Sequence, residues 1–272
     1  MMHTLQDVEA AVERLWPTRF AEDWDRPGLT TGDATASAMR IHLAVDAVAE
    51  TVAEALELGA DVLFVHHPLL LRGVTSISTD RYKGALLTDL IRGGCALVAA
   101  HTNADIVDDG TSSVIAKRLA LVQSTPIVAG ERPGTGLGRV GDLAEPTTLG
   151  RLALALGEIL PATATGIRVA GDYDQRISRV ALCAGAGDSL LADPAVTSAD
   201  VYITSDLRHH PASESRQQSM LSTGPALIDV SHWASEWLWL ESAASSLRAE
   251  LPQATITVSE LRTDPWDFVV TQ

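Results

Sequence analysis

The sequence is poor in features that mark a secreted or membrane-bound protein. Only two of its 272 residues are cysteines, Cys95 and Cys183, and each lies inside an apolar run, where a buried free thiol is expected. No apolar run approaches the roughly 18 residues that a membrane-spanning helix needs. The N-terminus has no basic region followed by an apolar core, as a secretory signal would. We therefore expect a cytoplasmic protein that does not associate with membranes.

Positive charge is also scarce. Lysine occurs only at Lys83 and Lys117, and 20 basic against 35 acidic residues give a formal net charge of −15. The arginines are scattered along the chain, so we expect no basic face that would bind the phosphate backbone of a nucleic acid. This balance favours a small-molecule substrate, and an anionic substrate would need divalent cations to neutralise it.

The patterning of the remaining residues indicates an α/β fold. Apolar residues make up 46% of the chain and charged residues 20%, as is typical of globular proteins. Short β-type runs alternate with segments whose apolar residues recur every three or four positions, which predicts helices packed on largely parallel or mixed sheets. The predicted strands are residues 41–46, 61–65, 95–100, 179–184, 201–205 and 225–230. The predicted helices are residues 47–59, 84–94, 111–121 and 232–250.

A stretch rich in glycine and proline, residues 124–161, interrupts this alternation. Such a composition is typical of a linker between two halves. On both sides of the stretch, the order is strand, histidine motif, helix, strand and histidine motif. We predict one unit of 272 residues with two similar α/β halves, approximately 1–128 and 129–272.

Four of the six predicted strands end in side chains that can bind a metal. In open parallel sheets, ligands bind beyond the carboxyl ends of the strands, where side chains from distant parts of the chain converge. The candidate side chains are His66, His67, His101 and Asp105 in the first half, and Asp206, His209, His210, His232 and Glu236 in the second.

The donor types indicate a pair of transition-metal ions. Imidazole and carboxylate suit zinc, iron, manganese, cobalt or nickel, whereas oxygen donors alone would favour magnesium or calcium. Five or six donors exceed the three or four that hold one zinc ion, but they fit two ions bridged by a carboxylate. His232 and Glu236, four residues apart in a predicted helix, would share one face of it. We predict two divalent ions per chain, with zinc favoured.

Each candidate also has a structural interpretation. A single histidine is more often a hydrogen-bonded structural residue than a ligand, and we interpret His3 and His42 in this way. An adjacent pair is harder to explain so, because both imidazoles must find partners. Asp46, Asp206 and His210 could orient ligands or relay protons, or they could be ordinary polar caps.

Two glycine-rich segments resemble loops that bind nucleotides. Residues 136–141 satisfy the G-x-G-x-x-G pattern, but Pro133 and Gly134 precede them in place of a strand, so we reject dinucleotide binding. Residues 184–189 follow a predicted strand and precede a segment expected to be helical, where backbone amides could hold an anion. We favour a simple tight turn at this second segment.

The sequence resembles the Nif-three-like dinuclear metal-centre family, many of whose members are named GTP cyclohydrolase 1 type 2 homologs. The matching stretches occur in family order: WDRPGL at 24–29, VHHPL at 65–69, HTNAD at 101–105, GLGRVG at 136–141, VYITSD at 201–206, and DVSH at 229–232 followed by Glu236. Two positions depart from the pattern, since Ser205 stands where glycine is usual and His209 where tyrosine is common. The chain also lacks the extra central domain of longer members.

The resemblance implies a toroidal homohexamer in which each subunit has a two-metal site between its two α/β halves, facing an internal cavity. The ligands carried over by motif are His66, His67, Asp105, His232 and Glu236, with Glu236 as the bridge. His101 belongs to the same motif and would either bind a metal or support a residue that does.

The activity that the resemblance implies is metal-dependent hydrolysis. In the cyclohydrolase interpretation, activated water attacks the purine ring of GTP, and His101 or His210 moves protons. Because fold and site type do not fix the substrate, hydrolysis of another nucleotide or of a small phosphorylated metabolite is an alternative. Another alternative is a non-catalytic ring that stores or delivers metal or docks a regulatory partner.

Overall fold

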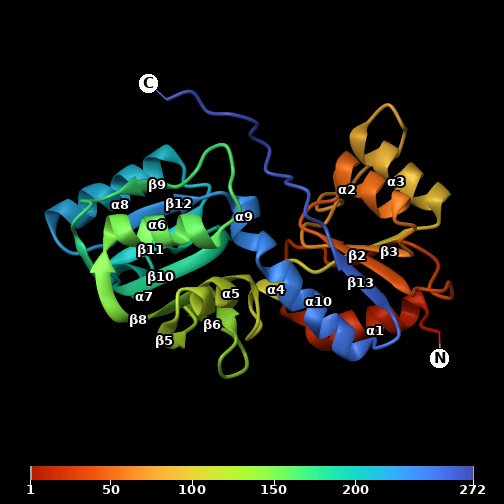
Figure 1. Ribbon diagram of the computed structural model, residues 1–272, viewed down its shortest axis with the longest axis horizontal. Helices are drawn as coiled ribbons and strands as arrows, with labels where there is room; N and C mark the ends of the chain where they lie inside the picture. The colour runs from red at the N-terminus through yellow and green to blue at the C-terminus, as the bar shows by residue number, and fades with distance from the viewer. Residues whose placement is uncertain (1, 272) are drawn as a thin grey trace. The chain divides into compact units, whose positions relative to one another are not determined.

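The computed structural model describes residues 2–271, which form two compact units (Figure 1). Unit 1 contains residues 2–104 and Leu240–Thr263, and unit 2 contains Asp105–Trp239 and residues 264–271. The C-terminal part of the chain thus returns to unit 1 before it ends in unit 2. The half boundary expected near residue 128 falls inside unit 2. Within residues 2–271, no helix combines the length and apolar character needed to cross a bilayer.

Unit 1 contains a five-stranded sheet in the order β1-β4-β3-β2-β13. Its strands are β1 (Gly28–Thr31), β2 (Arg40–Ala44), β3 (Val62–Val65), β4 (Ala96–Ala99) and β13 (Thr255–Val258). Strand β1 is antiparallel to β4, and the other pairs are parallel. All residues of β3 and β4 are buried, as expected for parallel strands covered on both faces. The three strands predicted in the first half are confirmed.

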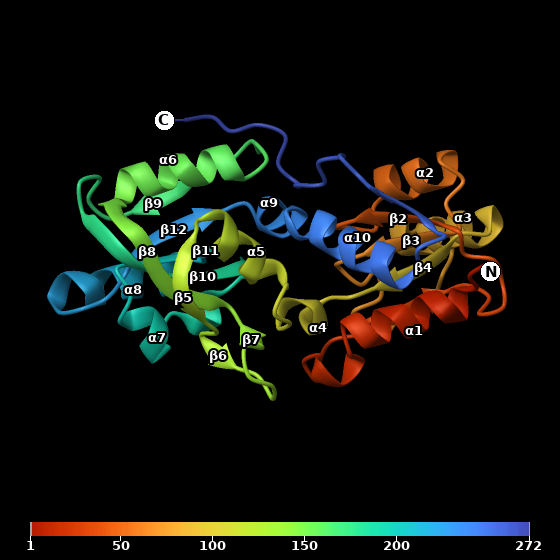
Figure 2. The ribbon, with the colours of Figure 1, turned by 60° about the horizontal axis from the view of Figure 1, so that its bottom comes forward.

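Helices cover both faces of this sheet (Figures 1 and 2). One face is covered by α2 and α3, the other by α1 and α10. Their bounds are α1 (Leu5–Leu15), α2 (Ala49–Glu57), α3 (Tyr82–Gly93) and α10 (Trp239–Glu250), and the short α4 (Thr102–Asp105) follows β4. Helix α3 ends at Gly94, whose φ of 67° lies in the left-handed region that glycine adopts without strain. The end of the helix predicted at residues 84–94 is confirmed.

A buried histidine joins three elements of unit 1. His42 in β2 is 2% exposed, and its Nδ1 lies 2.8 Å from Oγ1 of Thr257 in β13. Its Nε2 lies 3.0 Å from Oε2 of Glu54 in α2, and the Ser259 hydroxyl donates to the same oxygen. His42 therefore ties the C-terminal strand to the helix that covers the sheet, and the structural role expected for it is confirmed.

Unit 2 contains a mixed six-stranded sheet in the order β5-β8-β10-β11-β12-β9. The central strands β10 (Arg176–Ala186), β11 (Val201–Ser205) and β12 (Ala226–Val230) are parallel, and they confirm the three strands predicted in the second half. The outer strands β5 (Leu121–Thr125), β8 (Arg139–Thr148) and β9 (Arg168–Ala170) pair antiparallel with their neighbours. The helices of this unit are α5 (Thr111–Arg118), α6 (Leu149–Ile159), α7 (Pro194–Thr197), α8 (His209–Leu221) and α9 (His232–Trp237).

The prediction of a linker at residues 124–161 is wrong. This segment forms β6 (Val128–Ala129), β7 (Gly136–Leu137), β8 and α6, all within unit 2. Its glycines permit close packing, because a Cβ at Gly136 would lie 2.1 Å from the Val128 carbonyl oxygen across the β6-β7 pair. Residues 136–141 run from β7 into β8 and open no helix, so they do not have the strand-to-helix context of a dinucleotide-binding loop.

Two other segments differ from expectation in detail. The helix expected at residues 232–250 is divided into α9 and α10 at Leu238, whose N–H bonds to the Glu236 carbonyl rather than four residues back. Strand β10 extends to Ala186, and a 3-10 turn follows at Asp188–Leu190, where Arg208 donates to the Asp188 carboxylate. The chain therefore turns sharply at the segment where a tight turn was favoured, and the helix expected after it is the four-residue α7.

Replacement of His42 tests the bond network of unit 1. We expect His42→Ala to lower the free energy of unfolding by about 2–4 kcal/mol, since it opens a cavity and leaves Glu54 and Thr257 without their imidazole partner. Urea unfolding followed by circular dichroism measures the change. The exposed His209 gives the matched control, and a His42→Ala variant as stable as His209→Ala would contradict this role.

Candidate metal centre

Strand register gathers polar side chains at the carboxyl ends of the parallel strands of unit 1. Ala44 pairs with Val65, and Val65 pairs with Ala99, so β2, β3 and β4 end side by side. The residues that follow therefore emerge together: Asp46, the pair His66 and His67, and His101. Strand β1 is antiparallel to β4 and begins beside Ala99. Asp25 precedes β1 and therefore lies at the same end of the sheet.

Three imidazoles lie close together at these strand ends. His66, His67 and His101 each offer a ring nitrogen, and these nitrogens all lie within 4.8 Å of one another. The ring centroids are 5.0–5.4 Å apart. His66 is fully buried, and the other two are partly exposed. Three imidazoles at this spacing match the donors that hold a transition-metal ion in proteins.

Each of the three imidazoles has its Nδ1 against an oxygen acceptor. The Nδ1 of His66 lies 2.9 Å from the Ala100 carbonyl oxygen, and the Nδ1 of His67 lies 2.7 Å from Oδ1 of Asp46. The Nδ1 of His101 lies 2.8 Å from Oδ1 of Asp25. Since these oxygens accept, the neutral rings carry their proton on Nδ1 and their metal-binding lone pair on Nε2.

The two carboxylates behind the histidines are themselves held in place. Asp25 is 4% exposed and accepts hydrogen bonds from His101 and from the backbone N–H and hydroxyl of Thr102. Burial alone would raise the pKa of Asp25, but these hydrogen bonds outweigh it and hold the pKa well below its usual range. Asp46 also accepts from the Thr263 hydroxyl. Asp46 therefore orients a histidine, which is one of the roles considered for it. Asp25 was not identified from the sequence.

In unit 2, one turn of α9 presents a nitrogen and a carboxylate together. Nε2 of His232 lies 2.9 Å from Oε1 of Glu236, as their spacing of four residues predicts. Glu236 is 3% exposed. The backbone of β10 makes room for it, because a Cβ at Gly185 would lie 2.4 Å from Oε1 of Glu236. Gly185 also has a φ of 69°, so a larger residue there would be strained as well as crowded.

Asp206 orients His232 from behind. It follows β11, whose last residue pairs with the end of β12, and its Oδ2 lies 2.8 Å from Nδ1 of His232. Burial would lower the pKa of His232, but Glu236 and Asp206 outweigh it and raise the pKa to about 11. His232 therefore holds a proton between two carboxylates at neutral pH. A divalent cation bound there would have to replace this proton.

The other residues considered in the sequence have different surroundings. Asp105 at the end of α4 is partly buried, and its Oδ1 accepts from the Thr111 hydroxyl at 2.6 Å. His210 is exposed in the first turn of α8, with its ring 5.2 Å from that of His209. It belongs neither to the cluster of three imidazoles nor to the His232–Glu236 pair. The Ser205 side chain is fully buried, with its hydroxyl 3.4 Å from that of Ser235.

Known sequences resemble this chain over nearly its full length. The GTP cyclohydrolase 1 type 2 homolog of Streptomyces coelicolor is 43% identical over 272 aligned positions, which cover 97% of this chain and 94% of that protein. The homolog of Mycobacterium leprae is 33% identical, covering 98% of this chain and 96% of that protein. This second alignment runs over 376 positions, so the relative has a long segment that this chain lacks.

Solved structures share the fold. A Bacillus cereus protein related to NIF3 matches with a TM-score of 0.89 at 22% identity, and the match covers 99% of this chain and 100% of the other. The Staphylococcus aureus protein SA1388 matches with a TM-score of 0.88 at 25% identity, and this match also covers 99% of this chain and 100% of the other. Finally, the sequence profile described as Duf34/NIF3 (NGG1p interacting factor 3) matches residues 3–265. With the 43% identity of the Streptomyces relative, this match shows that the chain belongs to the DUF34/NIF3 family.

Proposed function

We propose that this protein binds two divalent metal ions per chain and uses them in a hydrolytic reaction, with GTP as the first candidate substrate. One observation carries the proposal: all four histidines of the two donor groups have their Nδ1 on an oxygen acceptor. The acceptors are the Ala100 carbonyl, Asp46, Asp25 and Asp206. Such acceptors behind a histidine are the usual companions of metal ligands, because they fix the ring and make its other nitrogen a better donor.

The proposed ligands come from both donor groups. They are His66, His67 and His101 in unit 1, and His232, Glu236 and the motif residue Asp105 in unit 2, with Glu236 as the bridge. We include His101 as a ligand because Asp25 holds it in the same way that Asp46 holds His67. Imidazole-rich donors favour zinc, and iron, manganese, cobalt or nickel would also suit them.

The chain's own residues prepare the site for this chemistry. Two bound cations supply Lewis acidity and lower the pKa of water. Asp25 stays ionised because its pKa is low, so it remains an acceptor for His101 and does not take its proton. The exposed Trp24 ring lies nearly perpendicular to the His101 imidazole, with 5.8 Å between the ring centroids. Proton transfer by His101 or His210, if the reaction needs it, belongs to the same proposal.

The substrate class rests on charge and on the names of the relatives. A chain with a net charge of −15 repels polyanions, but a small phosphorylated substrate can be neutralised by the cations themselves. The relatives named GTP cyclohydrolase 1 type 2 homolog make GTP the substrate to test first. The proposal also includes assembly into a homohexameric ring, as the resemblance implies, and a cytoplasmic location, as expected from the sequence.

Removal of the acceptors should weaken metal binding while the ligands remain. We expect Asp46→Asn and Asp25→Asn each to lower the affinity for zinc about 10- to 100-fold, because His67 or His101 loses its orienting carboxylate. Competition with a chromophoric chelator measures the affinity. Asp33→Asn is the matched control on an exposed carboxylate of the same unit. Equal affinities in all three variants would contradict the orienting role.

The ligand role of Glu236 is tested by metal content. Elemental analysis of the metal-loaded protein should give about two ions per chain, and Glu236→Ala should lower this to one or none. The control is Glu241→Ala, since Glu241 is exposed and paired with Arg248. Undiminished metal content in Glu236→Ala would remove Glu236 from the proposed site.

Catalysis is tested by turnover of the metal-loaded protein. We expect ring opening of GTP, measured by loss of the purine absorbance, and we expect a chelator to abolish it. Glu236→Gln should lower kcat by at least about 100-fold, because it removes a bridging charge from the reacting centre. If fully loaded protein turns over neither GTP, other nucleotides nor small phosphorylated metabolites, the result favours a non-catalytic metal-binding ring.

A further inference from the structure

The sheet of unit 2 ends in an exposed edge. Strand β9 (Arg168–Ala170) pairs with β12 on one side, and in the part of the chain that the structure describes no strand pairs with its other side. Arg168 and Val169 are exposed. An exposed strand edge presents unpaired backbone N–H and carbonyl groups, to which an extended segment can add as a further strand.

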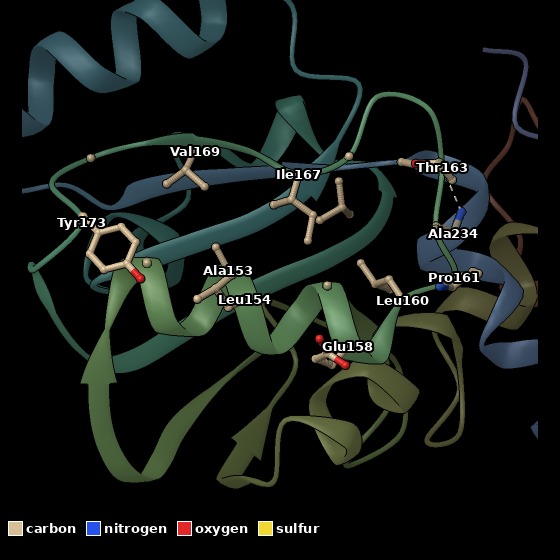
Figure 3. A pocket seen from close by; sticks show the side chains of 17 residues that line it. Ala153, Leu154, Glu158, Leu160, Pro161, Thr163, Ile167, Val169, Tyr173 and Ala234 are labelled. Atoms are coloured by element: carbon tan, nitrogen blue, oxygen red, sulfur yellow. Dashed lines mark hydrogen bonds between the residues drawn. The ribbon is translucent and has the colours of Figure 1, made fainter. Parts of the chain in front are cut away.

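One face of this edge borders an apolar groove of about 560 Å³ (Figure 3). The groove lies between α6 and the segment that contains β9. Its lining includes Leu154, Val169 and Tyr173, which are 64%, 43% and 59% exposed. Apolar side chains gathered around a hollow with this much exposure mark a binding surface.

The opposite face of the same edge is basic. A second hollow of about 420 Å³ is lined by Arg168, Val169 and Arg216. Asp229 is the one acidic residue that lines it, and it pairs with Arg168. Arg216 therefore adds an uncompensated positive charge beside β9. Val169 lines both hollows, so a strand added at this edge would face apolar groups on one side and basic groups on the other.

The C-terminal tail, residues 264–271, has the matching pattern. Trp266, Phe268 and Val270 are 61%, 80% and 73% exposed, and in an extended segment alternate residues point the same way. Asp267 would then point to the opposite side. The described part of the tail contains no basic residue. One face of the tail is thus apolar, and the other carries Asp267 together with Val269, which is 56% exposed. The apolar face complements the groove, and Asp267 complements the basic side of the β9 edge.

We propose that the tail of one copy of this chain adds to the β9 edge of a second copy. Trp266, Phe268 and Val270 would enter the apolar groove, and Asp267 would lie toward Arg168 and Arg216. The inference does not rest on the proposed metal chemistry, because none of these residues is a proposed ligand or orients one.

The start of the tail explains why the occupant is a second copy. Asp264 accepts from the Ser231 hydroxyl at 2.6 Å, and Ser231 is one of the residues that line the groove. Pro265 fixes its own φ and keeps Asp264 extended. Although the tail begins beside a lining residue of the groove, its apolar side chains stay exposed in the single chain. One copy therefore leaves both surfaces exposed, whereas exchange between copies covers them.

Disulfide trapping between two different variants tests the exchange. Phe268→Cys and Leu154→Cys protein would be mixed in equal amounts, oxidised mildly, digested and examined by mass spectrometry for a 154–268 disulfide. The native Cys95 and Cys183 are buried and would stay reduced. We expect at least roughly tenfold more of this disulfide than of the 221–268 disulfide from the control pair, in which Leu221→Cys replaces Leu154→Cys. Leu221 is also exposed in unit 2 but lies outside the groove.

Charge reversal gives a second measurement that does not depend on cysteine chemistry. We expect Trp266→Asp/Phe268→Asp to weaken association roughly thirtyfold in sedimentation analysis, because two aromatic anchors are lost. Arg216→Glu should weaken it roughly fivefold, and Asp267→Arg in the same chain should restore it. Circular dichroism would confirm that each variant is folded.

Two results would overturn the proposal. One is a 154–268 disulfide no more abundant than the control disulfide in the mixed sample. The other is a Phe268→Cys/Leu154→Cys double variant that, mixed with isotope-labelled copies, forms the disulfide only within single chains, since this would place the tail in its own groove.

Discussion

The candidate site depends on the hydrogen bonds that fix the Nδ1 atoms of its histidines, and these hydrogen bonds depend on strand register. His66 reaches the Ala100 carbonyl because β3 and β4 end level with each other. Asp206 reaches His232 because β11 and β12 end level in unit 2. A slip of one residue would turn each of these side chains to the other face of its sheet. The hydrophobic cores that fix the register therefore also fix which nitrogen of each ring can bind a metal.

The central strands could be predicted from the sequence, but the edge strands could not. Strands β3, β4, β11 and β12 are short, continuously buried runs, in which only Thr204, Ser205 and Asp229 interrupt the apolar pattern, since both of their faces are covered. Strand β9 has three largely exposed residues, and β13 pairs with β2 from more than 200 residues away. Nothing local distinguishes such segments from loops. The glycines of residues 124–161 were misleading for a related reason, because glycine marks close packing between strands as well as flexible turns.

The donors of the site were easier to predict than the residues that hold them. Paired histidines at a strand end and a His–Glu spacing of four are local signals, and the structure places His66, His67 and His101 together and His232 beside Glu236. Asp25 gave no such signal. It precedes an antiparallel strand, and it reaches His101, 76 residues away, only through the pairing of β1 with β4. Contacts of this kind follow from topology, which the sequence pattern determines only in outline.

Ser231 connects the donor pair of unit 2 with the C-terminal tail. Its hydroxyl oxygen accepts from the Ala234 N–H and so caps α9, the helix that carries His232 and Glu236. The same hydroxyl donates to Asp264, where the tail departs. Ser231 and Ala234 also line the apolar groove, so a segment bound there would pack against the first turn of α9. Asp206 holds the imidazole of His232 in the same turn. The groove, the start of the tail and the donor pair of unit 2 therefore meet at one helix N-terminus.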